Sequence, residues 1–200
     1  MKAASRMIKI SALAIALTLS GAFSVSAASY KLDKSHTYVG FVVKHLVISK
    51  VKGNFKDFEG GFDFDEKTKK LSNVSAVIQT QSIDTDNEKR DGHLKSGDFF
   101  KADEHKTITF KSTNAKHLGG NSYEVVGDLT MRGVTKSITL KGQLLGVVED
   151  SYFGNRAGLT ASATINRKDW GVSWNKSLDA GGLAVADEVE LLLEIEAVRN

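Results

Sequence analysis

Apolar and polar residues alternate along most of the chain beyond residue 29. Near residue 60, Phe58, Phe62 and Phe64 occupy one side of an extended chain, and acidic or small residues occupy the other. Successive side chains of a β-strand point to opposite faces, so this pattern predicts a strand with one buried and one solvated face. Further rows with the same period begin at residues 37, 74, 108, 123, 138, 159 and 189.

Eight or more strands at fairly even spacing predict an all-β antiparallel domain, either a sandwich or a barrel. Inward-facing Gly60, Gly127 and Gly142 favour the barrel, because strands bend sharply where a side chain is missing. Closure also removes exposed strand edges, and the chain has no proline to protect one. An eight-stranded barrel is either filled by its side chains or holds one small ligand, and the small residues Ala161 and Ala163 favour the hollow form.

A short helix is predicted around residues 86–96, between two of the strands. Thr85 and Glu88 have the spacing of a capping box, in which each side chain binds a free N–H at the helix start. Gly97 is placed to end the helix. The chain therefore leaves its alternating pattern once, at this helix.

Arg90, His93 and Leu94 share one face of this helix, since they lie three and four residues apart. In one interpretation they line the barrel mouth, and Arg90 or His93 donates a hydrogen bond to the oxygen-bearing head group of a ligand. In the other, Arg90 pairs with Asp86 and Leu94 only fills the core. Phe99 and the adjacent Phe100 are expected to anchor the segment on the barrel rather than to contact a ligand.

The first 28 residues have the layout of a cleavable signal peptide. A basic start precedes an uncharged, largely apolar run at residues 10–23, and small residues suit cleavage after Ala27 or Ala28. A run of this length is shorter than the roughly 20 residues of a membrane-spanning helix, so no stable membrane span is expected. Residues 29–200 then form a single exported domain.

Composition narrows the choice of partners. Without the signal peptide, basic and acidic residues are equal at 24 each, which gives no indication of a nucleic-acid partner. The chain has no cysteine, so stability must come from burial and hydrogen bonding rather than from disulfides.

No arrangement of residues typical of an active site or a metal centre is present. The five histidines lack the short spacings that prepare a metal site on one strand or helix. Nucleophile elbows, phosphate loops and cysteine nucleophiles are also missing. The sequence therefore predicts no catalytic residue, no metal ligand and no cofactor.

Several motifs together resemble the YceI-like family of periplasmic lipid-binding proteins. Within residues 82–100, the pieces Ser-x-Asp-Thr, Arg-Asp-x-His-Leu and Ser-x-Asp-Phe-Phe match in order and spacing. Residues 127–136 and 164–171 resemble further family blocks. The likeness covers nearly the whole chain after the signal peptide. It departs from the family at Ser137 and at His105-Lys106, where the family often has proline.

The resemblance implies a lipocalin-like antiparallel eight-stranded β-barrel in the periplasm that binds an isoprenoid lipid without covalent chemistry. The ligand would be a polyprenol or an isoprenoid quinone, which the protein would carry, store or sense. The inward rows then supply most of the expected pocket lining: Phe41, Val43, Phe58, Phe62, Phe64, Ile78, Phe110, Leu129, Leu140, Leu144, Leu159, Leu191 and Leu193. Trp170 is a further candidate for the pocket wall, or else a plug at the end of the barrel.

Two alternatives remain open at this point. The protein could be an enzyme acting on a lipid or a sugar, with a metal gathered from His36, His45 and His93. It could also be an interaction module whose barrel has a solid core. The sequence does not decide the identity of the lipid or whether the chain forms a homodimer.

Overall fold

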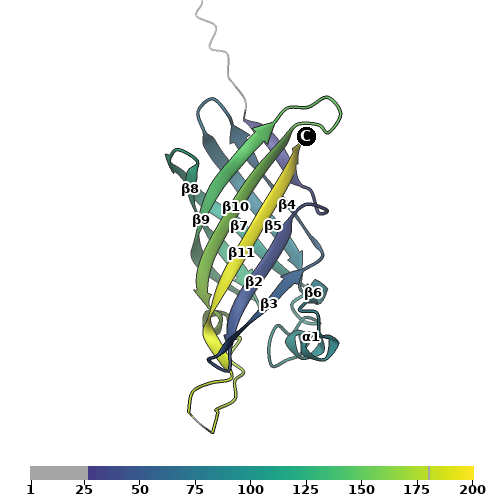
Figure 1. Cartoon of the computed structure of the whole chain (residues 1–200), viewed down its shortest axis with the longest axis vertical. Coiled ribbons are helices and arrows are strands. Elements are labelled where there is room, and N and C mark those ends of the chain that lie inside the picture. The colour runs from purple at the N-terminus through teal and green to yellow at the C-terminus, as the bar shows by residue number, and fades with distance from the viewer. Residues whose placement is uncertain (1–26, 180) are drawn as a thin grey trace, which may run out of the picture.

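The computed structural model describes residues 27–179 and 181–200, so the predicted signal peptide lies almost wholly outside the described residues. The chain folds into one antiparallel sheet of eleven strands that curls into a barrel (Figure 1). The strands are β1 (Ala28–Leu32), β2 (Tyr38–His45), β3 (Ser49–Phe55), β4 (Phe58–Asp65), β5 (Lys70–Gln79), β6 (Ile83–Asp84), β7 (Thr107–Gly119), β8 (Ser122–Met131), β9 (Val134–Val148), β10 (Arg156–Asn166) and β11 (Val185–Arg199).

These strands occupy eight positions around the barrel, because three of the positions are each filled by two consecutive strands. β2 pairs with β3, and β1 continues along the same edge by pairing with β4. β5 and β6 form the next interrupted strand, which pairs with β4 and β3. β11 closes the barrel by pairing with β10 on one edge and with β2 and β1 on the other. The eight-stranded antiparallel barrel predicted from the sequence is confirmed.

Two inward glycines allow neighbouring strands to approach closely. A Cβ on Gly60 would lie 2.2 Å from the carbonyl oxygen of Ser75, and one on Gly127 would lie 2.4 Å from the Phe110 ring. The pairing register shifts near both glycines, between Gly61 and Asp63 and between Ser112 and Asn114. The sheet therefore curves where the side chain is missing, as expected at barrel bends.

The helix α1 (Glu88–Lys95) lies where it was predicted, but the capping box is wrong. Asn87 is the N-cap, and its side-chain oxygen accepts a hydrogen bond from the backbone N–H of Arg90 at 2.9 Å. Asp86 has a left-handed backbone with φ of 58°, which separates Thr85 from the helix start. The helix ends at Ser96 rather than through a left-handed Gly97.

The barrel has two different ends (Figure 1). The terminal end carries the start of β1, the C-terminus and the β9–β10 connection. The α1 end carries the helix, the β2–β3 turn and the long β10–β11 connection, which begins with the 3-10 helix η2 (Arg167–Trp170). A second 3-10 helix, η1 (Thr80–Ser82), joins β5 to β6. None of the helices in the described part of the chain is both long and apolar enough to cross a membrane.

Aromatic and aliphatic side chains close the terminal end. Phe64 packs edge-on against Tyr123, with ring centroids 6.4 Å apart, and the Tyr123 hydroxyl donates to the carbonyl of Lys69. Tyr30 stacks on Phe62 at 5.3 Å. All four rings are buried, so they form a packed layer at this end of the barrel.

Candidate functional site

The interior of the barrel holds a cavity of about 240 Å³. This volume is far larger than the ~10–15 Å³ that one buried water requires. The cavity lies against β2, β10 and β11, whose inward residues Phe41, Ala161 and Leu191 are only half-buried because they face the empty space. The interior is therefore hollow, and the alternative of a solid-cored barrel does not fit.

Most of the side chains that periodicity assigned to a pocket lie on the cavity wall. These residues come from eight different strands, so the wall is assembled from nearly the whole length of the described chain. They are Phe41, Val43, Phe62, Ile78, Phe110, Leu129, Leu140, Leu159, Leu191 and Leu193.

Phe58, Phe64, Leu144 and Trp170 were predicted to line the pocket, but the structure places them outside its wall. All four are buried. The Trp170 indole N–H donates to the carbonyl of Leu129 at 3.0 Å, which fixes the ring within packed side chains. Periodicity identifies the inward face of a strand correctly. It does not tell whether an inward residue lies beside the cavity or in the packed layers at the two ends.

The segment after α1 contributes to the wall more than expected. Leu94 points into the cavity, in agreement with the prediction that it faces inward. Phe99 and Phe100 were expected only to anchor the segment, yet both border the cavity. Phe100 also packs edge-on against Phe55 at 6.0 Å, so the anchor and the wall are the same side chains.

The two head-group candidates do not border the cavity. Arg90 donates from Nε and Nη2 to the hydroxyl and carbonyl oxygens of Thr85, both at 2.7 Å, instead of pairing with Asp86. The His93 Nε2 atom lies 2.9 Å from Asp98, and its ring packs edge-on against Trp174 at 4.8 Å. Both side chains therefore hold the α1 segment in place, and the predicted head-group contact has no support in this geometry.

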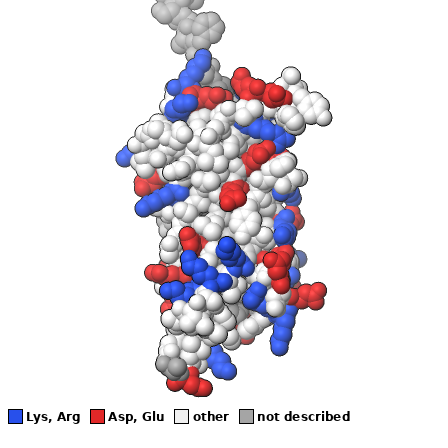
Figure 2. Space-filling view, in the orientation of Figure 1, with Lys and Arg blue, Asp and Glu red and all other residues white. Residues whose placement is uncertain are grey.

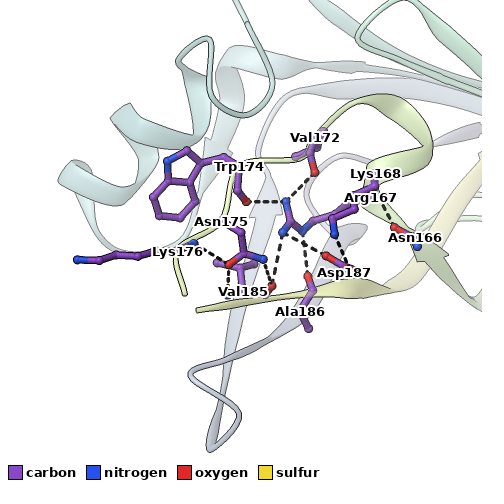
Figure 3. A network of polar contacts seen from close by, with 10 residues as sticks. All are labelled: Asn166, Arg167, Lys168, Val172, Trp174, Asn175, Lys176, Val185, Ala186 and Asp187. Carbon is purple, nitrogen blue, oxygen red and sulfur yellow. Dashed lines mark hydrogen bonds and ion pairs between the residues drawn. The ribbon is translucent and has the colours of Figure 1, made fainter. Parts of the chain in front are cut away.

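Arg167, which the sequence reasoning missed, is the one charged residue among the described residues that border the cavity. It is 4 % exposed. Its guanidinium lies among backbone carbonyls (Figure 3): Nε donates to Ala186, Nη1 to Val172 and Trp174, and Nη2 to Val185.

The same guanidinium forms an ion pair with Asp187 at 3.5 Å. Burial lowers the pKa of Arg167, and the Asp187 carboxylate partly opposes this shift. Since its donors are already engaged, Arg167 fastens the β10–β11 connection to the barrel end and has little left to offer a ligand. The period-two alternation of β10 could have identified its inward position, because Arg167 continues the inward row of Ala163 and Ile165.

The histidines proposed for a metal do not gather. Among residues 27–179 and 181–200, the only group of three metal-binding side chains is Asp33, His36 and Glu196. The Arg156 guanidinium already binds both carboxylates of this group, at 2.7 Å from Asp33. Hydrogen bonds from His36 and then from Arg156 hold the pKa of the Asp33 carboxyl far below its usual range. The cluster is therefore an ion-pair network in which Arg156 already supplies the positive charge. His45 is not a member of this cluster.

Comparison with known proteins agrees with this architecture. Residues 30–197 match the model of the YceI-like domain. A UPF0312 protein from Pseudomonas aeruginosa is 42% identical over 193 residues, which cover 96% of this chain and 97% of that protein.

Two solved structures share the fold. The crystal structure of the Campylobacter jejuni YCEI protein is 33% identical, with a TM-score of 0.69, and covers 84% of this chain and 96% of its own. A polyisoprenoid binding domain from Saccharophagus degradans is 16% identical, with a TM-score of 0.60 over 87% of this chain and 99% of its own. The chain therefore belongs to the YceI-like family, as its motifs predicted.

Proposed function

We propose that the protein binds one long isoprenoid lipid, such as a polyprenol or an isoprenoid quinone, non-covalently inside the barrel. The observation that carries this proposal is the internal cavity with an almost wholly apolar wall. The fold shared with a domain described as polyisoprenoid-binding supports the same class of ligand. Carriage, storage and sensing all begin with this binding step.

Apolar burial supplies the affinity in this proposal. Each buried CH₂ contributes about 0.8 kcal/mol, whereas association itself costs on the order of 4–15 kcal/mol. Only a long chain can therefore bind well. Because the wall offers few hydrogen-bonding groups and Arg167 is engaged, the head group is expected to remain near the opening of the barrel.

Binding fits the cavity better than catalysis does. Among the described residues that border the cavity, none is a histidine, an aspartate or a glutamate. The wall thus lacks the usual general acids and bases of an active site. The enzyme alternative has no observation in its favour.

Organic extraction of the protein purified from its native host, followed by mass spectrometry, tests the proposal. Wild-type protein is expected to carry an isoprenoid. The variant Ala161→Phe places a large ring in the cavity and is expected to lose the lipid while remaining folded. Ser162→Phe, which carries the same ring on the outer face of β10, is the matched control and should retain it. Wild-type protein that never yields an isoprenoid, or an Ala161→Phe variant that keeps it, would overturn the proposal.

We also propose that the protein acts in the periplasm after cleavage of residues 1–27. Ala28 is already part of β1, where it pairs with Phe64. Cleavage after Ala27 therefore leaves the first strand whole, whereas cleavage after Ala28 shortens it. Amino-terminal sequencing of the exported protein should find Ala28 first, and retention of Met1 in that fraction would contradict the proposal.

A further inference from the structure

The β2–β3 turn at the α1 end exposes apolar side chains in a strained backbone. Leu46 and Val47 have left-handed φ angles of 50° and 66°. This conformation is unfavourable for a β-branched residue such as Val47. Ile48, at the tip, is 86 % exposed. Neither the strain nor the exposure is compensated by burial within the described part of the chain.

The β10–β11 connection enlarges this apolar surface. The backbone N–H of Leu46 donates to the carbonyl of Ala184 at 2.9 Å, which places the two loops side by side. Leu183 is also exposed. We call Leu46, Val47, Ile48 and Leu183 the tip patch.

Lysines without partners flank the tip patch. Lys44, Lys50 and Lys52 are exposed and form no ion pair with any described residue. Lys44 and Lys50 lie directly opposite each other on the hairpin, where like charges repel. Residues 44–52 contain no acidic side chain. The neighbouring strand β11 carries carboxylates, such as Glu190 opposite Val42, but none of them forms an ion pair with these lysines within the described residues. An anionic partner would relieve the repulsion between the lysines.

The tip patch lies at the end of the barrel where the α1 segment borders the cavity. Val43, beside Lys44, borders the cavity, and so does Val185, beside Ala184. Half-buried Leu94 and Phe100 border it from the α1 side. The β2–β3 turn, α1 and the β10–β11 connection thus surround the same end of the barrel (Figure 1).

We propose that the tip patch and its three lysines dock the α1 end on the surface of an anionic phospholipid bilayer. The apolar side chains enter the interface and the lysines contact the phosphate groups. Docking would let an isoprenoid pass between the bilayer and the cavity without crossing water. This role in lipid transfer rests on the proposed function. On the face shown in Figure 2, positive and negative side chains are interspersed over the barrel surface.

The terminal end supplies a natural comparison. Tyr152 and Phe153 are exposed there in the β9–β10 connection, so both ends of the barrel present apolar side chains. Glu149 and Asp150 directly precede these two rings, whereas Lys44 and Lys50 flank the tip patch. An anionic surface would repel the carboxylates and attract the lysines. The exposed Lys67, Lys69 and Lys70 at the β4–β5 turn also lie at the terminal end, so the test compares the two apolar groups directly.

The test is flotation of the mature, full-length protein with phosphatidylcholine vesicles that contain or lack phosphatidylglycerol. Wild-type protein should float only with the anionic vesicles, and high salt should weaken the binding. The triple variant Lys44→Gln, Lys50→Gln, Lys52→Gln should bind about 100-fold more weakly, from a loss of about fivefold per lysine.

Val47→Gly tests the apolar part of the tip patch without the risk of unfolding. Glycine adopts the left-handed φ of this position freely, so this variant should be at least as stable as wild type. With Ile48→Ser added, it should lose at least tenfold in vesicle affinity. The control Tyr152→Ser, Phe153→Ser should bind like wild type.

Wild-type protein that does not float with anionic vesicles would overturn the docking proposal. An acidic protein would then be the partner expected for the lysines. Equal loss of binding in the control at the terminal end would overturn it as well. Lipid content is measured on the same samples. Protein that carries isoprenoid without binding vesicles refutes docking alone, and protein that binds vesicles without carrying isoprenoid refutes the proposed function alone.

Discussion

Replacing Leu144 and Leu191 by alanine applies the same chemical change to two inward positions with different surroundings. Leu144 is 8 % exposed and packs in the closed terminal end, away from the cavity wall. Leu191 borders the cavity and is half-buried. Loss of three carbons removes about 2.4 kcal/mol of transfer free energy from a fully buried leucine, at about 0.8 kcal/mol per carbon.

At Leu144 the substitution also opens a new void, so the total loss in the free energy of unfolding should be about 3–5 kcal/mol. At Leu191 it only enlarges a space that exists already, and part of the side chain is exposed to that space. The loss there should be about 1–2 kcal/mol, below the full transfer term.

Urea unfolding of lipid-free protein, followed by circular dichroism, measures both losses under identical conditions. Removal of lipid matters because a bound ligand would stabilise the folded state of the wild type and of the two variants to different extents. Equal losses at the two positions would refute the reasoning, since they would mean that Leu191 is packed as tightly as Leu144. The cavity would then not be the empty space that the proposed function requires.

Three further predictions concern the polar contacts of the barrel. Arg167→Met should lower the free energy of unfolding in urea by roughly 3–5 kcal/mol, because buried carbonyls and Asp187 lose their donor. The pKa of Asp33 is depressed in the folded state below its unfolded value of about 3.9, so the unfolded chain binds more protons. This contribution to stability is present above that value and is lost as the pH falls below it. Asp33→Asn should therefore flatten the acid side of a plot of unfolding free energy against pH, and an unchanged acid slope would contradict the assignment. Asn87→Ala removes the observed N-cap and should cost about 1 kcal/mol, whereas Glu88→Ala, in the rejected capping box, should be close to neutral by thermal melting.

The sequence by itself determined the all-β class, the strands and their inward faces. Alternation with period two is a local property, because each side chain points away from its neighbours whatever the rest of the chain does. The family motifs were equally local, and they indicated the barrel; the isoprenoid ligand that they imply is the subject of the proposed function. The alternation along β10 also predicts that Arg167 faces inward, although an arginine is not usually expected at an inward position.

Only the tertiary structure decided how far each inward residue lies from the empty part of the barrel. Phe64 and Leu191 have the same pattern in the sequence, yet one is packed in the closed end and the other faces the cavity. The partners of Arg90 were likewise beyond the reach of spacing rules, because the left-handed turn at Asp86 brought Thr85 to its guanidinium. Such contacts depend on closure of the barrel and on the path of its connections, which join residues far apart in sequence. Local patterns therefore determine which face of a strand is buried, and closure of the barrel determines whether that face contacts packed side chains or the cavity.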